Sequence, residues 1–297
     1  MKADLHIHSH YSNDGEFGIR EIIEKSVTKG IDIFSITDHN SVKGSREAAQ
    51  LIAEYRDLHF IPGIEIDCNY QGTDLHLLAY QVTLDGNEFE NLEREVRCKY
   101  LDAVPEMIHN LQQLGIEIDR DELMQRSGGE PPSAELFAEL LLEKPEQQTN
   151  PALLPYLPGG IRSDMPLINF YLDFFAQGKP AYVKVEHLDF EDALALVHHK
   201  GGVPVVAHPG LNLKDREEVV SELLDLGAAG LEVFNNYHSP EQAAFFASET
   251  SKRGAIMTCG SDFHGNTKPL ISLGEYLFLE HYRQDLERSL SVLLKHK

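Results

Sequence analysis

The sequence predicts an α/β fold, arranged as an α/β barrel or an open sheet and interrupted by a mostly helical insertion. In the first and last thirds of the chain, short apolar runs alternate with segments of helical period. This alternation is typical of parallel βα units. The middle of the chain, from about residue 88 to 178, lacks the alternation and has mainly the helical period.

The first third contains the expected strands and helices that begin the core. Residues 18–30 carry apolar side chains every three or four residues, which is the period of a helix, and a second helix is expected at 43–56. The expected strands are the apolar runs at 3–8, 31–37, 59–66 and 74–82. The run IDIFSIT is rich in isoleucine, which favours a strand.

The last third resumes the same alternation of strands and helices. Strands are expected at 202–208, 229–234 and 255–262, and helices at 213–227, 240–253 and 281–295. We therefore expect a discontinuous metal-binding domain of residues 1–87 and 179–297. Residues 88–178 would form a helical insertion subdomain, with a loop at 143–165 that is rich in Pro, Asn and Gly.

The charge of the chain limits its partners. It has 26 Lys and Arg against 48 Asp and Glu, a formal net charge of −22. This balance argues against broad docking on a nucleic-acid backbone, so duplex DNA is not an expected partner. A local cationic pocket, or bound divalent ions, would still accept a phosphate.

The sequence also suggests where the protein works. No apolar run approaches the ~18 residues of a membrane span, and the N-terminus MKADLHIHSHYSNDG lacks the apolar region of a secretory signal. The cysteines are few, odd in number and far apart, so a disulfide framework is not expected. We expect a cytoplasmic protein with no membrane partner.

Metal-ligand side chains follow one expected strand after another. They are His6, His8, Asp14, His39, Glu65, His76, His208, Asp262 and His264. In a βα barrel the carboxyl ends of the strands share one face, so these residues would converge there. Nine nitrogen and oxygen ligands are too many for one tetrahedral ion and suit two or three ions that share a carboxylate.

The spacing of the first pair has a physical reason. Residues i and i+2 of a strand point to the same face, so His6 and His8 can both reach one ion. Each residue alone has a plainer explanation, because Asp14 lies in an Asn-Asp-Gly turn sequence and Glu65 could sit in an ion pair. The joint pattern is what favours a shared metal site.

Other catalytic chemistries lack their sequence signatures. The chain has no Gly-x-x-x-x-Gly-Lys-[Ser/Thr] phosphate loop, no Gly-x-Gly-x-x-Gly after the first strand and no Gly-x-Ser-x-Gly elbow. The cysteines also lack the paired spacing of a structural zinc site.

These residues resemble those of the polymerase and histidinol phosphatase (PHP) superfamily. DLHIHSHYSNDG, TDHN, GIEI, LHLLAY, VAHPG and GSDFH occur in its order, and the resemblance covers roughly residues 1–85 and 180–265. It implies a distorted (β/α)7 TIM-like barrel, a trinuclear metal centre and phosphoester hydrolysis.

The resemblance also implies how the ligands are shared. His6, His8, Glu65 and Asp262 would hold the first ion. Glu65 would bridge to a second ion that His76 and His208 also hold, and Asp14, His39 and His264 would hold the third. Some members have His in place of Asp14; Asp is a harder ligand and favours Mn²⁺ or Fe²⁺ over Zn²⁺. We expect two to three divalent ions, Mn²⁺, Fe²⁺ or Zn²⁺, as cofactors.

Within the superfamily the chain looks like the group that acts on nucleotides or short RNA. That group has a helical insertion followed by a segment like GKPAYV at 178–183. It includes 3′,5′-nucleoside bisphosphate phosphatases and 5′→3′ exoribonucleases. Many members of the group carry an Arg and a His near the start of a helix in the insertion, whereas this chain has Pro-Pro-Ser-Ala-Glu at 131–135. We therefore expect the substrate to depend on the unusual 131–165 segment.

The expected reaction is attack on phosphorus by a water that bridges two ions. His238 and His187 are candidates for the acid that protonates the leaving group. Arg162, in the Gly-rich loop PGGIRSD, and Lys184 are candidates for substrate binding outside the metals. We expect a small phosphorylated substrate, a nucleotide or a short single-stranded RNA.

Alternatives to a nucleotide phosphatase remain open. They are an exoribonuclease or oligonucleotide hydrolase, a histidinol-phosphate-type phosphatase, a catalytically silent metal-binding protein, and a metal-dependent ester or amide hydrolase. A silent protein would be expected to lose ligands, and none of the nine is lost. An ester or amide hydrolase would be favoured by a Lys ligand, and none is evident.

Overall fold

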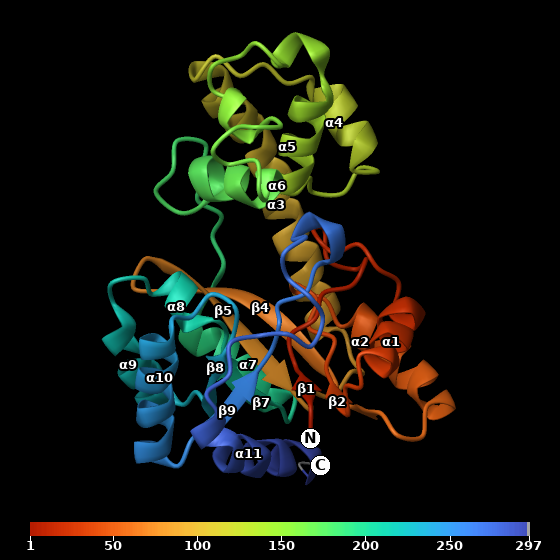
Figure 1. Cartoon of the computed structure of the whole chain (residues 1–297), viewed down its shortest axis with the longest axis vertical. Helices are drawn as coiled ribbons and strands as arrows, with labels where there is room; N and C mark the ends of the chain where they lie inside the picture. Colours follow the sequence, from red (N-terminus) through yellow and green to blue (C-terminus); the bar gives the residue numbers. More distant parts are fainter. Residues whose placement is uncertain (296–297) are drawn as a thin grey trace. The chain divides into compact units, whose positions relative to one another are not determined.

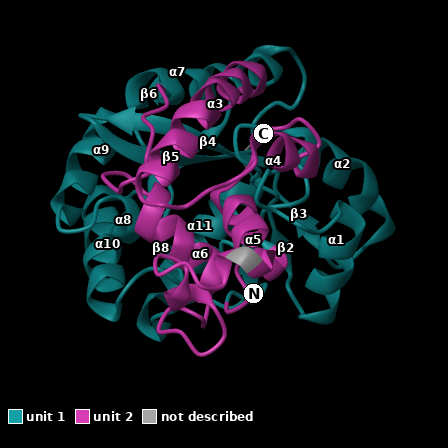
Figure 2. Cartoon of the chain, turned by 90° about the horizontal axis from the view of Figure 1, so that it is seen from above, with its two compact units in different colours: residues 1–92, 187–264, 271–297 teal, residues 93–186, 265–270 magenta. Residues whose placement is uncertain are grey.

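A computed structural model of the chain describes residues 1–295, without the side chain of Glu146, and has the mixed α/β content that the sequence predicts (Figure 1). The chain forms two compact units (Figure 2). Unit 1 comprises Met1–Leu92, His187–His264 and Ile271–Lys297, and unit 2 comprises Glu93–Glu186 and Gly265–Leu270. The expected barrel domain ends at residue 297, so its last two residues lie outside the described part.

The strands of unit 1 form two sheets, one of order β1-β2-β3 and one of order β6-β4-β5-β7-β8-β9. The strands are β1 (Ala3–Asp4), β2 (Ile33–Phe34), β3 (His59–Phe60), β4 (Gly63–Tyr70), β5 (Thr73–Tyr80), β6 (Leu188–Asp189), β7 (Val203–Val206), β8 (Gly230–Phe234) and β9 (Ile256–Cys259). Each expected strand overlaps an observed one, the run expected at 59–66 is divided between β3 and β4, and β6 lies outside the expected strands.

Strand β5 runs antiparallel to both of its neighbours, β4 and β7. The β4–β5 hairpin turns at Gln71 and Gly72, both of which have positive φ, 50° and 81°. Two successive residues with positive φ make the turn whose twist suits a two-residue hairpin. The expectation of parallel βα units throughout the core is therefore wrong for β5, because a hairpin replaces a helical crossover.

Two isolated parallel bridges link the sheets at the edge where the ligands lie. One joins Ile7 to Phe263 and the other joins His39 to Glu65. Backbone hydrogen bonds reinforce the first, because the Asp262 N–H donates to the His6 oxygen at 2.9 Å. The segments that follow β1 and β9 are thereby held side by side.

Helices cover the strands of unit 1. They are α1 (Ile19–Thr28), α2 (Lys43–Leu51), η1 (Ile52–Glu54), α7 (Phe190–His199), α8 (Pro209–Asn212), η5 (Glu217–Val219), α9 (Val220–Leu226), α10 (Pro240–Arg253), η7 (Glu280–Tyr282) and α11 (Arg283–Lys295). α7 packs on β4, β5 and β7, α10 packs on β8, and α11 packs on β9 (Figure 1).

Helix α10 begins and ends where the sequence predicts, for identifiable reasons. The Ser239 hydroxyl accepts from the Gln242 N–H, and the Gln242 side chain accepts from the Ser239 N–H, which is a capping box. Pro240 occupies the first helical position, where its missing N–H costs nothing. Gly254, with φ of 62°, ends the helix.

Unit 2 is mainly helical, with its own apolar core around Phe137, Phe170 and Leu141. Helix α3 (Glu88–Gln113) begins in unit 1 and continues into unit 2, so the boundary between the units falls within this helix. The other elements are α4 (Arg120–Arg126), α5 (Ala134–Glu143), η2 (Pro145–Gln147), η3 (Leu154–Tyr156), α6 (Pro166–Phe170), a π-helical turn, η4 (Tyr171–Phe175), and η6 (Gly265–Thr267). Across residues 1–295, no helix combines the length and apolarity that crossing a membrane requires.

Candidate metal centre

All nine residues that the sequence singled out as ligands lie in unit 1. Three overlapping groups contain them, and within each group the ligand atoms lie within 4.8 Å of one another. The groups are His6, His8, Glu65 and Asp262; Glu65, His76 and His208; and His8, Asp14, His39 and His264. The proposed third set lacks His8, and a fourth group joins Asp67 to His39 and His76.

The first group forms around the two histidines that follow β1. The Nε2 atoms of His6 and His8 each lie 3.1 Å from Glu65 Oε2 and 3.2 Å from Asp262 Oδ1. His6, His8 and Glu65 have no exposed side-chain surface. Four donor atoms thus converge on one buried point, which is the number that a tetrahedral ion needs.

The second group uses the other oxygen of Glu65. Glu65 Oε1 lies 2.9 Å from His76 Nδ1 and 3.1 Å from His208 Nε2. The sequence placed His76 at the carboxyl end of a strand, but it lies in the first half of β5. Because β5 is antiparallel, His76 stands opposite Asp67 and shares a face with Glu65, two residues earlier in β4.

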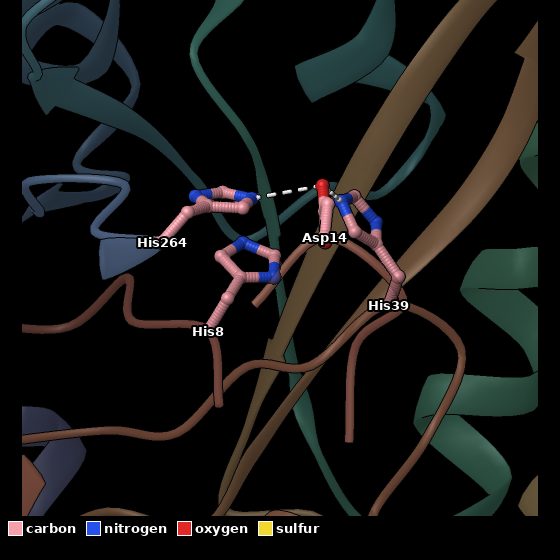
Figure 3. A group of neighbouring side chains, drawn as sticks. All are labelled: His8, Asp14, His39 and His264. Atoms are coloured by element: carbon pink, nitrogen blue, oxygen red, sulfur yellow. Dashed lines mark ion pairs between the residues drawn. The ribbon is translucent and has the colours of Figure 1, made fainter. Parts of the chain in front are cut away.

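The third group gathers around Asp14. Asp14 Oδ2 lies 3.1 Å from His264 Nε2 and 3.8 Å from His39 Nε2, and the two rings approach it from opposite sides (Figure 3). The rings of His8 and His264 stack with centroids 3.9 Å apart. Asp14 therefore lies among these histidines, where its carboxylate could bind an ion as well as shape the turn.

The histidines also have partners on the nitrogen that faces away from their group. His6 Nδ1 lies 3.1 Å from Glu232 Oε1, and His39 Nδ1 lies 3.1 Å from Asp67 Oδ1. The remaining contacts join His8 Nδ1 to Ser12 Oγ, His208 Nδ1 to Asn212 Oδ1 and His264 Nδ1 to the Asp262 oxygen. In each pair the oxygen can accept a hydrogen bond from the ring N–H, which leaves the lone pair of the other nitrogen to bind an ion.

Sequence reasoning missed Asp67 and Glu232. Asp67 lies 3.1 Å from His39 and 3.7 Å from His76, and the Asn40 side chain donates to it at 2.9 Å. Both residues could have been identified from the sequence. Asp67 follows Glu65 at the i+2 spacing of a strand, and Glu232 is a carboxylate inside the apolar run GLEVF.

The electrostatics of the group depend on carboxylates packed against imidazoles. Burial lowers the pKa of His6, but the carboxylates of Glu65, Glu232 and Asp262 outweigh it and hold that pKa well above its usual range. Burial raises the pKa of Glu65, but the nearby imidazoles hold it well below its usual range. The cluster therefore attracts positive charge, from protons or from metal ions.

The donor set fits divalent metal ions. The four groups contain six imidazoles and four carboxylates, which are the nitrogen and oxygen ligands that Zn²⁺, Mn²⁺ and Fe²⁺ accept. The outer acceptors orient the rings in the way that metal-bound histidines require.

The proposed acids differ in their surroundings. His238 is buried, its Nδ1 lies 2.9 Å from the Val233 oxygen, and its Nε2 accepts from the Gly210 N–H at 3.1 Å. Both nitrogens thus contact the main chain, an arrangement that fixes the loop after His208. His187 precedes β6, which pairs with β4 so that His187 comes beside Asp67.

Arg162 and Lys184, the proposed substrate contacts, belong to unit 2. Arg162 grips both oxygens of Asp173 at 2.9 Å, and Lys184 pairs with Glu186 at 2.8 Å. A substrate phosphate at Arg162 would therefore compete with the Asp173 carboxylate.

The chain is similar to known proteins along most of its length. Residues 4–143 match the PHP domain. The 3′,5′-nucleoside bisphosphate phosphatase of Chromobacterium violaceum is 27% identical over 265 residues, covering 88% of this chain and 86% of the relative. The 5′-3′ exoribonuclease of Haemophilus influenzae is 25% identical over 269 residues, covering 89% and 90%.

A solved structure extends the similarity to the fold. An inferred metal-dependent phosphoesterase from Bifidobacterium adolescentis superposes with a TM-score of 0.75 and 26% identity, covering 96% of both chains. Together with the PHP domain, these relatives decide the class of the protein. We conclude that the chain contains a PHP domain at residues 4–143 and is a metal-binding hydrolase of phosphoester bonds.

Proposed function

We propose that the protein hydrolyses a phosphate monoester of a small nucleotide of the 3′,5′-nucleoside bisphosphate type and releases inorganic phosphate, with two to three divalent ions (Mn²⁺, Fe²⁺ or Zn²⁺). The main support for this proposal is the way in which the ligand groups overlap. The three ligand groups share residues, since Glu65 belongs to the first and second and His8 to the first and third. Ions held in these groups would lie close enough to act on one phosphate.

Each group would hold one ion. His6, His8, Glu65 and Asp262 would hold the first, with Glu65 bridging to a second that His76 and His208 also hold. Asp14, His39 and His264 would hold the third. We further propose that the core of unit 1 is a distorted (β/α)7 barrel. Its support is the pair of bridges that link the two sheets, Ile7 to Phe263 and His39 to Glu65.

The residues of the chain would bind and orient the reactants. Bound divalent ions would supply an acidified water and neutralise charge on the phosphoryl group. Burial of His6, His8 and Glu65 keeps bulk water away from the inner side of the cluster. We propose His187 as the acid that protonates the leaving oxygen, because it comes beside Asp67 at the margin of the cluster, whereas His238 is engaged with the main chain.

A second candidate function is hydrolysis of short single-stranded RNA from its 5′ end. The support is the similarity to the Haemophilus exoribonuclease, which covers as much of the chain as the phosphatase does. The two functions use the same ligand groups and differ in the length of substrate that is accommodated. Substrate length therefore discriminates between them.

A turnover screen with Mn²⁺ tests these proposals. It compares a 3′,5′-nucleoside bisphosphate, a 5′-phosphorylated dinucleotide, histidinol phosphate and a sugar phosphate. We expect the highest kcat/KM for the bisphosphate. A higher value for the dinucleotide would favour the exoribonuclease, and a higher value for histidinol phosphate would contradict a nucleotide substrate. No turnover of any phosphoester by the metal-loaded protein would favour a catalytically silent protein.

Arg162 offers a test of how the second phosphate is recognised. Replacing Arg162 with Ala removes a guanidinium able to grip phosphate at two points. We expect the variant to raise KM for the bisphosphate about tenfold or more, the loss of roughly 1.4 kcal/mol, while KM for an aryl phosphate changes little. Equal effects on both substrates would remove Arg162 from the binding site. Lys144→Ala is a matched control, because that cation pairs with Glu122 elsewhere in unit 2.

A further inference from the structure

Glu232 is a buried carboxylate of β8 that contacts ligands of two different groups. Its side chain has no exposed surface. Its Oε1 and Oε2 lie 3.1 and 3.2 Å from His6 Nδ1. Its Oε2 also accepts a hydrogen bond from the His208 backbone N–H at 2.8 Å. His6 belongs to the first ligand group and His208 to the second.

The contact with His6 decides which ring nitrogen carries the proton. A neutral imidazole has one N–H and one lone pair, and a carboxylate can only accept. In the neutral ring of His6 the proton therefore lies on Nδ1, and the Nδ1–H donates a hydrogen bond to Glu232. This leaves the Nε2 lone pair pointing toward Glu65 and Asp262, where an ion would be bound.

The backbone at Gly260 passes very close to the contact between His6 and Glu232. A Cβ atom added at Gly260 would lie 2.3 Å from the Cβ of His6 and 2.7 Å from Glu232 Oε1. Any side chain at residue 260 would therefore displace His6 or Glu232. The close approach of the segment after β9 to this pair requires glycine.

We propose that Glu232 is a positioning residue of the metal centre. It holds His6 as the Nδ1–H tautomer and fixes the backbone of His208, so that one buried carboxylate aligns ligands of the first and second ions. The inference rests on the proposed metal centre and adds to it a residue that would bind no ion itself.

Replacing Glu232 with glutamine tests whether its role depends on accepting a hydrogen bond or only on the packing of the side chain. Glu232→Gln keeps the size of the side chain but replaces one oxygen with an NH₂ donor. The remaining oxygen is needed by the His208 N–H. The NH₂ group then faces His6 Nδ1 and favours a proton on Nε2, the nitrogen that should bind the ion. A purely structural role would be much less sensitive to this exchange.

The dissociation constant for Mn²⁺, measured by the paramagnetic resonance signal of free Mn²⁺, tests the proposal. We expect Glu232→Gln to weaken binding at the tightest site by about 10–100-fold, as for other outer partners of metal ligands. Glu249→Gln is the matched control, because Glu249 is also buried in unit 1 but pairs with Lys252 and Arg253. Unchanged Mn²⁺ affinity in folded Glu232→Gln would overturn the proposal.

A measurement on the wild-type protein keeps the proposal testable if the variant does not fold. In the Zn²⁺-loaded protein, long-range ¹⁵N–¹H correlation spectra report which nitrogen of each histidine is protonated. We expect His6 to carry its proton on Nδ1 and to bind Zn²⁺ through Nε2. Binding through Nδ1 would overturn the role of Glu232. Failure of the wild-type protein to bind either metal would instead contradict the metal centre itself.

Discussion

Asp14 is the residue that distinguishes the third ligand group, because its other members are histidines. It lies 3.1 Å from His264 and 3.8 Å from His39. Its surroundings hold the pKa of its carboxyl well below the usual range: burial raises that pKa, but His264, His39 and His8 outweigh it. A carboxylate that stays ionised among imidazoles gives this group a harder ligand than a fourth imidazole would.

Metal preference should therefore depend on Asp14. We expect Asp14→His to raise the ratio of Zn²⁺ to Mn²⁺ affinity by about tenfold, because imidazole suits Zn²⁺ better than the harder Mn²⁺. Competition between the two ions, followed by metal analysis of the protein, measures the ratio. Asp57→His, at an exposed position outside the ligand groups, is the control. A ratio that stays the same in both variants would exclude Asp14 as a ligand.

His39 gives the metal-free protein a pH dependence of known sign. Burial lowers the pKa of His39, but the carboxylates of Glu65, Asp67 and Asp14 raise it to about 10. This folded-state pKa exceeds the unfolded value of about 6.5. The stability from protonated His39 is therefore fully present below about pH 6.5 and is lost as the pH rises through about 10.

We expect the urea midpoint of the metal-free protein to decrease as the pH rises from 6.5 to 10. His39→Gln should make this decrease smaller. His198→Gln, at an exposed position of α7, should leave the slope unchanged. A slope in His39→Gln equal to that of the wild type would contradict the assignment. Metal affinity should change in the opposite direction and rise with pH, because ions compete with protons for the same nitrogens.

At the residue scale, the proposed ligands can be picked out from the sequence, whereas their contacts with the residues behind them cannot. His6, His8 and the other ligands stand in a recognisable order along the sequence. Glu232 reaches His6 across 226 positions of the chain. Only the pairing of the strands brings them together, and that pairing follows from no local pattern.

The β4–β5 hairpin is the element that most changes how the site is built. Its antiparallel direction places His76 beside Glu65 and opposite Asp67. The sequence predicts both strands but not their direction, because a strand has the same period whichever way it runs. The turn sequence Gln-Gly also differs from the Asn-Gly that usually indicates this type of hairpin.

The turn can be tested by exchanging its two central residues. Gln71 adopts a positive φ that glutamine disfavours, so Gln71→Asn should raise the free energy of unfolding by about 0.5 kcal/mol. Gly72→Ala should lower it by about 1 kcal/mol, although nothing lies within 4 Å of the added Cβ. Urea unfolding of the metal-free variants measures both. A stabilising Gly72→Ala would contradict the observed turn.

At the scale of the whole molecule, the sequence predicts a helical insertion but not its limits. The alternation of strands and helices stops near residue 88, yet α3 runs across the boundary of the units at residue 93. Residues Gly265–Leu270 group with unit 2 although they directly follow the proposed ligand His264. A change of periodicity indicates where an element type changes, but long-range packing decides which unit a segment joins.

The metal centre should make a large contribution to the stability of the protein. Buried carboxylates and imidazoles crowd together in unit 1, and ions would bind the folded chain far better than the unfolded one. At a free Mn²⁺ concentration one hundred times the dissociation constant, we expect about 2.7 kcal/mol of stabilisation for each site. Thermal unfolding with Mn²⁺ and then with excess chelator measures the effect. Equal melting temperatures would contradict ion binding at these residues.

Anomalous scattering from a crystal grown with Mn²⁺ tests the central claim most directly, because it locates the ions without reference to any substrate. The account predicts two or three peaks in unit 1, one on each side of Glu65, toward the His6–His8 pair and toward His76–His208, and the third beside Asp14. Peaks only at other residues, or a well-ordered ligand cluster without any peak at saturating Mn²⁺, would contradict it.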